Sequence, residues 1–344
     1  MTAQIVKREQ ITIPFAPDVP GLVFRGFQGE SDYPKMLELI NASKVVDQID
    51  RTDTLEDIVR NYEHLNNCDP YRDMIFAEVD GEAIAYGRVE WNIRDENEWL
   101  GYIMAFMHPD WRRKGIGTAM LRYQENHLRH ISKNLLKEGV ITEETLRYFE
   151  NFASDTEIAK EAFLLKEGYS AVRYAYSMVR PFSDPIQVSP MPEVLEIRTV
   201  PRDQFRKVWK ADQEAFKDHW GYVPGTDNDY QRWLENPLHD PNLWRVAWVG
   251  DQVAGMVLNF LNQEENEEYN RKRGWTEDIS VRRPWRRRGL ARALLTRSLQ
   301  MFKDMGMDHA ALGVDTENLT GALNLYQSVG FQVEKQHTDY RKKL

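Results

Sequence analysis

The chain is poor in cysteine: its 344 residues contain one, Cys68. A single thiol can build neither a disulfide framework nor a cysteine-ligated zinc site, so we expect a reducing compartment. Long apolar runs are also missing, and no window approaches the roughly 18 apolar residues that cross a bilayer. The N-terminus shows no apolar core followed by a small-residue cleavage site. We therefore expect a soluble cytoplasmic protein without a membrane partner.

Positive charge is in deficit as well. Lys and Arg number 45 against 54 Asp and Glu, which gives a net charge of −9. A general nucleic-acid binder needs a basic surface, so nucleic acid is not an expected partner. The histidines show no metal-ligand spacing, and we expect no metal. The length suggests two domains, and the 42% of hydrophobic residues allows each of them a core.

Two arginine-rich stretches, residues 107–117 and 281–291, repeat one pattern. Each follows a strand-like run and precedes a helix-like run. Each carries Arg-x-x-Gly-x-Gly/Ala at the junction, as Arg112, Gly115 and Gly117 and then as Arg286, Gly289 and Ala291. Glycines at such a junction let backbone N–H groups close around a phosphate at the positive end of a helix. The duplication indicates two copies of one ligand-binding module.

The repeat extends beyond these loops. Hairpin-like runs precede both loops, and a Gly-aromatic pair followed by an alternating strand closes both halves. Residues 181–192 hold four prolines and predict a linker. We therefore expect an arm (1–20), a first module (21–180), this linker (181–192) and a second module (193–344). The interleaved strands and helices predict an α/β fold, with a mixed, mostly antiparallel sheet flanked by helices in each module.

The second copy resembles the GNAT superfamily of acyl-CoA-dependent N-acyltransferases. It has the loop Arg286–Ala291 and then Asn318-x-x-x-Ala322-x-x-Leu325-Tyr326-x-x-x-Gly330-Phe331. Two linked modules with the fuller signature in the second also resemble the tandem mycothiol synthases. The resemblance implies acetyl-CoA as donor and an amine as acceptor. Mycothiol's precursor is one candidate acceptor, but no residue selects it, and the chain could be a monomer or a homodimer.

The resemblance also implies which residues hold the donor. A strand that splays at the loop would let Ile279, Val281 and Arg283 pair with pantetheine. The remaining predicted contacts of the second copy are Arg286, Arg287, Arg288, Gly289, Leu290, Ala291, Arg292 and Asn318. Those of the first copy are Met107, Arg112, Arg113, Lys114, Gly115, Ile116, Gly117 and Thr118. The phosphates of CoA explain the arginine cluster better than nucleic acid does.

Two side chains are candidates for proton transfer. Tyr326 stands where the family places the acid that protonates the departing thiolate, although a Leu-Tyr pair on a helix is also ordinary core packing. The family's glutamate position is Trp275 here. Glu277 shares a strand face with Trp275 and Val281 by period-2 geometry, and it could hold a water that deprotonates the amine. It could equally be a solvent-facing carboxylate. Asp278 is expected on the other face.

The first copy lacks both candidates. Alignment of the loops and of the closing glycines puts Ile103 where Glu277 stands and Leu164 where Tyr326 stands. We therefore expect the first module to bind CoA without catalysis, or to be a scaffold.

Acceptor contacts are expected from Asp218, His219, Trp220 and Tyr222, which precede Tyr230 and Trp233. Aromatic rings with an acidic group suit a cationic or sugar-like amine. Aromatic packing between helices is the alternative, and His219 is a second candidate base. The leading function is N-acetylation of a small-molecule amine. A peptide N-acetyltransferase and a non-catalytic CoA sensor are the alternatives.

Overall fold

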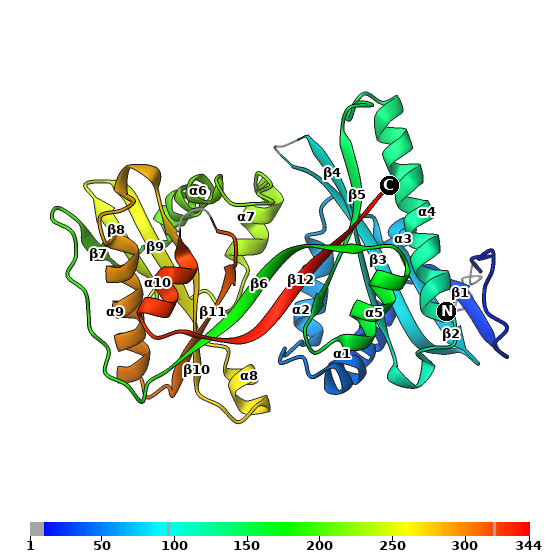
Figure 1. The fold of residues 1–344 in the computed structure, drawn as a ribbon, viewed down its shortest axis with the longest axis horizontal. Coiled ribbons are helices and arrows are strands. Elements are labelled where there is room, and N and C mark those ends of the chain that lie inside the picture. The colour runs from blue at the N-terminus through cyan, green and yellow to red at the C-terminus, as the bar shows by residue number, and fades with distance from the viewer. Residues whose placement is uncertain (1–9, 95–96, 319–320) are drawn as a thin grey trace, which may run out of the picture. The chain divides into compact units, whose positions relative to one another are not determined.

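The computed structural model describes residues 10–94, 97–318 and 321–344. The predicted arm before residue 10 lies outside these residues. The chain divides into two compact units (Figure 1). Unit 1 comprises the residues up to Val172 together with Asp339–Leu344, and unit 2 comprises Arg173–Thr338. No helix of the described residues is long and apolar enough to cross a membrane.

Unit 1 is a mixed sheet with helices on its faces. Its strands run in the order β1-β2-β3-β4-β5-β12; from β1 to β5 the neighbouring strands are antiparallel, except that β4 and β5 are parallel. Its elements are β1 (Leu22–Arg25), α1 (Tyr33–Asp47), α2 (Leu55–Glu63), α3 (Pro70–Asp73), β2 (Met74–Val79), β3 (Glu82–Arg94), β4 (Glu98–Met107), α4 (Ile116–Lys137), β5 (Leu146–Ser154), α5 (Ile158–Lys166) and the end of β12 (Gln332–Lys343).

Unit 2 repeats this plan. Its strands run in the order β12-β6-β11-β10-β9-β8-β7, with β10 and β11 parallel. Its elements are β6 (Ser170–Pro181), β7 (Glu196–Arg198), α6 (Phe205–Phe216), α7 (Asp227–Leu234), β8 (Arg245–Val249), β9 (Gln252–Phe260), α8 (Gln263–Glu268), β10 (Arg273–Val281), α9 (Leu290–Asp304), β11 (His309–Asp315) and α10 (Ala322–Ser328). The predicted α/β class, with a mixed and mostly antiparallel sheet in each module, is confirmed.

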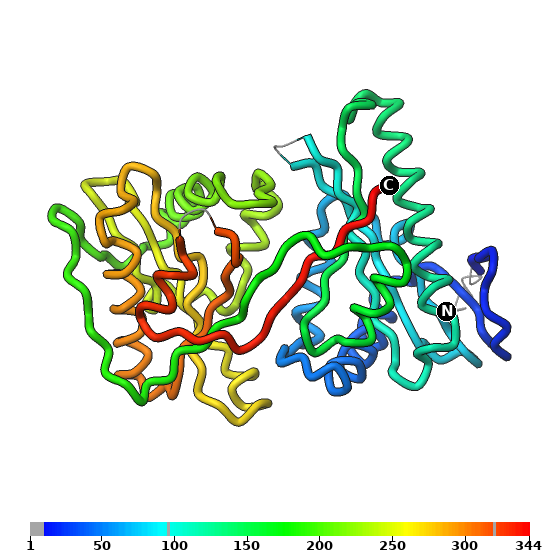
Figure 2. The backbone as a smooth tube through the Cα atoms, viewed as in Figure 1, coloured from blue at the N-terminus to red at the C-terminus, as the bar shows by residue number. Residues whose placement is uncertain are grey.

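The last strand of each half does not lie in the module to which the predicted boundaries assign it. Most of β6, expected to close the first module, pairs antiparallel with β11 inside unit 2. The chain's last residues instead join β5 in unit 1, where the Leu344 N–H donates to the Arg147 carbonyl at 3.0 Å. Figure 2 traces both strands. The boundary therefore falls near residue 172 rather than 180, because strand pairing assigns β6 to the later half.

The proline-rich segment is docked along α9 of unit 2. The Ser189 N–H donates to the Thr296 hydroxyl at 3.1 Å, and the Lys303 ammonium donates to the Phe182 carbonyl at 3.1 Å. The Phe182 side chain is buried among the apolar residues of α9, β11 and α10. Proline still excludes helix and central strand there, as its backbone chemistry requires. The segment therefore packs along unit 2 as part of it.

A buried ion pair secures the C-terminus in unit 1. The Arg341 guanidinium pairs with Glu150 at 2.6 Å and with Glu98 at 3.2 Å, and its side chain is 9% exposed.

We predict that Arg341→Ala lowers the free energy of unfolding by about 2 kcal/mol. This is less than the ~3–5 kcal/mol expected when a buried charge loses every partner, because Arg94 still pairs with Glu150. Urea unfolding measures it. The exposed neighbour Lys343→Ala should change stability by less than about 0.5 kcal/mol, and an equal loss in both variants would contradict the assignment.

Candidate functional site

The two arginine-rich loops have the same backbone. Arg113 and Arg287 adopt positive φ of 64° and 59°, and two residues later Gly115 and Gly289 adopt 84° and 81°. These glycines cap α4 and α9. Two left-handed residues this close together turn neighbouring N–H groups toward one side of the loop, next to the positive helix end. Both loops therefore have the backbone shape that the predicted anion sites require, and anion binding by either loop stays a prediction.

The first arginine of each loop anchors the loop to the end of the first α-helix of its unit. Arg112 makes two hydrogen bonds of 2.7 Å with Asp47 at the end of α1. Arg286 repeats this with Asp218, just after α6, at 2.5 Å, and also donates to the Ala215 carbonyl at 2.9 Å. The sequence assigned Arg286 to the donor and Asp218 to the acceptor. The structure brings the two together as an internal pair.

Asp218 is also bonded to Arg283. Hydrogen bonds from Arg283 and then Arg286 hold the pKa of the Asp218 carboxyl well below its usual range. Arg283 and Asp218 were predicted to contact different ligands, and their pairing turns both side chains toward the loop. Sequence reasoning missed the pair because the two residues lie in segments with no shared pattern.

Four of the predicted donor contacts place a cation at or beside the surface of their loop. Arg287 and Arg288 are exposed, and the Arg288 guanidinium lies 5.0 Å from the centre of the Trp285 ring. Lys114 stands over Trp111 in the same way in unit 1, at 4.2 Å. Arg292 donates to the Ser328 hydroxyl of α10 at 2.5 Å. These positions suit phosphate oxygens.

Two other predicted contacts are core side chains. Leu290 is 1% exposed and Ile116 is not exposed at all. Both pack under the first turn of their helices, against the sheet. Only the main-chain N–H of either residue could face an anion. A periodic apolar residue at the start of a helix is the sequence signal for this packing.

The central parallel strands of unit 2 separate next to the loop. β10 pairs with β11 only along Arg273–Trp275 and His309–Ala311. In unit 1, β4 and β5 likewise pair along Glu98–Tyr102 and Leu146–Glu150 only. Beyond these registers each strand offers main-chain groups that no neighbouring strand uses, as the family resemblance implies for the approach of pantetheine.

A β-bulge in β10 changes which residues face the separated strands. Glu277 is opposite Leu258 and Ser280 is opposite Met256, so β10 holds one residue more than β9 in this interval. Asp278 lies in the bulge with a φ of 45°. A bulge shifts every later side chain to the other face.

The expected facing of this strand is therefore wrong beyond the bulge. Leu258, the partner of Glu277, belongs to the apolar cluster beneath α6. Val281 belongs to the cluster beneath α9, with Leu290 and Leu294. Glu277 and Val281 thus face opposite sides of the sheet. Asp278 was expected on the face opposite Glu277, but the bulge carries it to the same side, where its charge acts on Glu277.

Glu277 and Tyr326 are close enough to influence each other. Burial, then the neighbouring Asp278, raise the pKa of Glu277 to about 8, while a hydrogen bond from the Gly313 N–H lowers it. Burial, then Glu277, raise the pKa of Tyr326 above its usual range. Tyr326 is 5% exposed and packs against Phe331. At neutral pH the site therefore holds a protonated phenol beside a carboxyl that titrates near the working range.

The corresponding place in unit 1 is apolar. Ile103 and Leu164 lie in one buried cluster with Phe149 and Leu128. Neither aligned position therefore carries a proton-transfer group. The unit 1 loop is also closer to its own arm: a β-carbon on Gly115 would lie 3.2 Å from Pro17, whereas one on Gly289 would meet nothing within 4 Å. Thr118 bonds Glu167 at 3.3 Å, and Met107 packs in the core beside the loop.

The predicted acceptor residues lie in the segment after α6. His219 packs on Phe216 with ring centres 4.3 Å apart, and burial lowers its pKa. Arg173 stands 5.1 Å from the centre of the Trp220 ring and also pairs with Asp315 at 2.7 Å. The Tyr222 N–H donates to the His219 carbonyl at 3.2 Å. Asn318 follows β11, and its N–H donates to the Asp315 carbonyl at 3.3 Å.

The two later aromatics match the alternative reading. Tyr230 packs against Trp209 with ring centres 5.3 Å apart. Trp233 packs against Trp244 with centres 5.5 Å apart. Both rings belong to α7 and join it to α6 and β8. They support the fold of unit 2.

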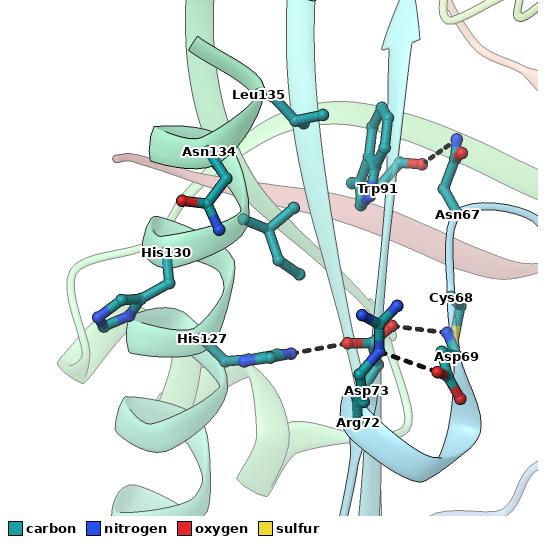
Figure 3. A pocket seen from close by; sticks show the side chains of 11 residues that line it. Asn67, Cys68, Asp69, Arg72, Asp73, Trp91, His127, His130, Asn134 and Leu135 are labelled. Carbon is teal, nitrogen blue, oxygen red and sulfur yellow. Dashed lines mark hydrogen bonds and ion pairs between the residues drawn. The ribbon is translucent and has the colours of Figure 1, made fainter. Parts of the chain in front are cut away.

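Unit 1 also contains a pocket of about 460 Å³ that sequence reasoning did not find. Figure 3 shows His127 of α4 directed at Asp73, with Nε2 and the carboxylate 2.7 Å apart. Trp91 and Leu135 contribute apolar walls. The lining comes from three distant segments, none with a motif, so no sequence signal marks it. Its polar groups are paired with one another, and within the described residues no cluster of His, Cys, Asp and Glu is arranged to hold a metal ion.

Known proteins resemble both halves. A model of the acetyltransferase (GNAT) family matches residues 205–331, and one of the acetyltransferase (GNAT) domain matches residues 70–170. The mycothiol acetyltransferase of Salinispora arenicola is 23% identical over 317 residues, covering 90% of this chain and 94% of that protein. That of Thermobispora bispora is 28% identical over 165 residues, covering 48% and 55%. A GCN5-related N-acetyltransferase from Sphaerobacter thermophilus has a TM-score of 0.68, with 26% identity over 96% of this chain and 97% of that one.

Proposed function

This chain belongs to the GNAT family of acetyltransferases, and on that premise we propose that unit 2 acetylates the primary amine of a small molecule. The donor in this family is acetyl-CoA. The observation that carries the proposal is the pairing of a titratable Glu277 with a protonated Tyr326 where β10 and β11 separate, beside an open anion loop. Unit 1 repeats the loop without these groups, and we assign it no chemistry.

The residues of unit 2 fit the donor. The left-handed Arg287 and Gly289 direct main-chain N–H groups at a diphosphate, with nothing in front of Gly289 within 4 Å. The exposed Arg287 and Arg288 supply positive charge. The edge of β10 beyond Trp275, which β11 does not pair, can bond the amides of pantetheine at Ile279, whereas the Val281 carbonyl already accepts a hydrogen bond from Arg286 Nε at 2.9 Å. Arg286 acts indirectly in this account, by fixing the loop to Asp218.

The chemistry needs two proton transfers. An amine attacks the thioester carbonyl only when neutral, so the Glu277 carboxylate takes its proton, directly or through one water. The new N–C bond forms as the C–S bond breaks. The Tyr326 hydroxyl then gives its proton to the thiolate, and the second proton that the acylated nitrogen loses restores the phenol. Because the pKa of Glu277 is about 8, the carboxylate form grows as the pH rises through 8, and so should the rate.

A small amine is favoured over a peptide by the aromatic and acidic residues after α6. The His219 ring is influenced by the Asp315 carboxylate, and Asp315 pairs with Arg173, which stands over the Trp220 ring; an aromatic surface with a carboxylate beside it suits a small amine. A peptide acceptor remains the second candidate, since peptide amines need the same two proton transfers. A panel of amines and peptides, followed by release of the CoA thiol, separates the two by their kcat/KM. Donor binding without release over the whole panel would instead favour the sensor alternative.

Tyr326→Phe tests the assignment of the active unit. We expect kcat to fall about 100-fold, less than for loss of the base, because a thiol of pKa ~8.5 is a good leaving group even without an acid. Release of the CoA thiol measures it. Gly115→Glu, which blocks the unit 1 loop, should retain activity. Loss of activity with Gly115→Glu and retention with Tyr326→Phe would move the chemistry to unit 1.

A further inference from the structure

Three carboxyl groups meet on the α6 side of β10 in unit 2. Glu277 and Asp278 come from the strand, and Asp212 comes from α6, which packs on β9 and β10. None of the three forms an ion pair with a Lys, Arg or His among the described residues of the chain. A group of carboxyls without a cation cannot be fully ionised in a partly buried place, so protons must be divided among them.

The β-bulge is what brings Asp278 into this group. On a regular strand, neighbouring residues face opposite sides, and Asp278 would lie beneath α9. The extra residue and a φ of 45° place it beside Glu277 instead. The left-handed region is unfavourable for most side chains but accessible to Asp and Asn. The backbone therefore holds a local strain whose result is a second carboxyl next to the candidate base.

Asp212 has the surroundings of a neutral acid. Its Oδ1 atom is buried and has no hydrogen-bond partner, while the nearby Ser280 hydroxyl lowers the pKa of the group. A carboxylate oxygen deprived of both water and donors is unfavourable, so the group keeps its proton. Burial and then Asp278 raise the pKa of Asp212 well above its usual range. Burial raises the pKa of Asp278 to about 6, so at pH 7 Asp278 is the charged member of the pair.

The other elements around Glu277 add little charge. β9 contributes Leu258 and Met256, which are apolar. β11 contributes the Gly313 N–H, which stabilises the carboxylate, and α10 contributes the Tyr326 phenol, which is neutral. His219 responds to Asp315, Arg286 and Asp218 rather than to this group. Asp278 is thus the charge that governs Glu277.

We propose that Asp278, held beside Glu277 by the bulge, is a positioning residue that sets the ionisation and basicity of Glu277, with Asp212 retaining the proton that would otherwise neutralise Asp278. This rests on the proposed role of Glu277 as the base. A carboxylate with a raised proton affinity is a stronger base toward an ammonium group than an ordinary glutamate. The cost is that less of the enzyme is in the active form at neutral pH.

The test is the pH profile of kcat/KM for an amine acceptor, with purified full-length variants. For Asp278→Asn, which also tolerates a positive φ, we expect the midpoint of the rising limb to move down by about one pH unit from near 8, because a like charge has been removed. The plateau value of kcat/KM at high pH should fall about threefold. The pKa of the base is lower by about one unit, and the rate of proton transfer depends on that pKa with a Brønsted slope of about one half. Below pH 7 the variant should therefore be faster than the parent.

Two matched variants identify the cause. Asp212→Asn replaces a neutral carboxyl group by a neutral amide of similar size. The midpoint of the rising limb should therefore stay near that of the parent. Asp278→Gly adopts a φ of 45° without strain and should reproduce the shift if Asp278→Asn folds poorly. A midpoint that stays near 8 in both Asp278 variants overturns the proposal. Loss of the limb in Glu277→Gln confirms the base independently; a limb that persists there overturns the role of Glu277 and this inference with it.

Discussion

Replacement of Glu277 by Gln is expected to lower kcat/KM for amine acetylation about 1000-fold at pH 8, within the range that general bases contribute. Gln keeps the size of the side chain and its hydrogen bond from Gly313, but it cannot take a proton. The rising limb near pH 8 should disappear. Acetyl transfer measured from pH 6 to 10 by CoA thiol release gives both results.

Acceptors of graded basicity sharpen this experiment. An amine of low pKa is already neutral at pH 7 and needs no base, so its rate should fall least in Glu277→Gln. The rate with a strongly basic amine should fall by the full factor of about 1000. An equal loss for every amine would show that Glu277 supports the structure only. A limb below pH 6.5 in the parent enzyme would instead indicate His219, whose pKa is lowered by burial.

Gly289→Glu is expected to weaken acetyl-CoA binding about 1000-fold. The new side chain would need the left-handed conformation at a φ of 81°, and it would put a negative charge where the diphosphate meets the loop. Isothermal titration with acetyl-CoA, or the shift in melting temperature that the donor causes, measures the change.

Gly306→Glu is the matched control. Gly306 ends α9 with a φ of 79° and, like Gly289, has nothing within 4 Å of a β-carbon. Both variants should lose about 1–2 kcal/mol of stability from the same backbone strain. Only Gly289→Glu should lose the donor. If Gly306→Glu weakens binding equally, strain in α9 and not the loop explains the result, and the anion site is disproved.

The sequence predicts local geometry well where a single residue type enforces it. Gly115 and Gly289 take the left-handed conformation because other residues pay a steric penalty there, and the anion loops follow from their spacing. The sequence predicted correctly that Glu277 lies on the same face of β10 as Trp275, but it wrongly predicted Val281 on that face as well. A bulge leaves no mark in composition, and one inserted residue reverses every later position.

Contacts between residues far apart in the chain could not be predicted from the sequence. Nothing in the pattern around Asp218 indicates that Arg283 and Arg286 bind it. β6 and β12 both alternate in the same way and both close a half-repeat, so the sequence cannot say which sheet each one joins. Leu290 shows a different case: the family resemblance predicted it at the donor, whereas its side chain lies in the core with Leu294.

The placement of Asp339–Leu344 beside β5 has a consequence for synthesis on the ribosome. β5 ends at Ser154, yet the segment that covers its edge is translated only after residues 155–338. At ~5–20 residues per second, that edge stays open for about 10–40 s while the remainder emerges. An uncovered strand edge invites pairing with other nascent chains. Premature termination anywhere in the second half would therefore leave the first half with an unsealed sheet, although every residue of its own half had been made.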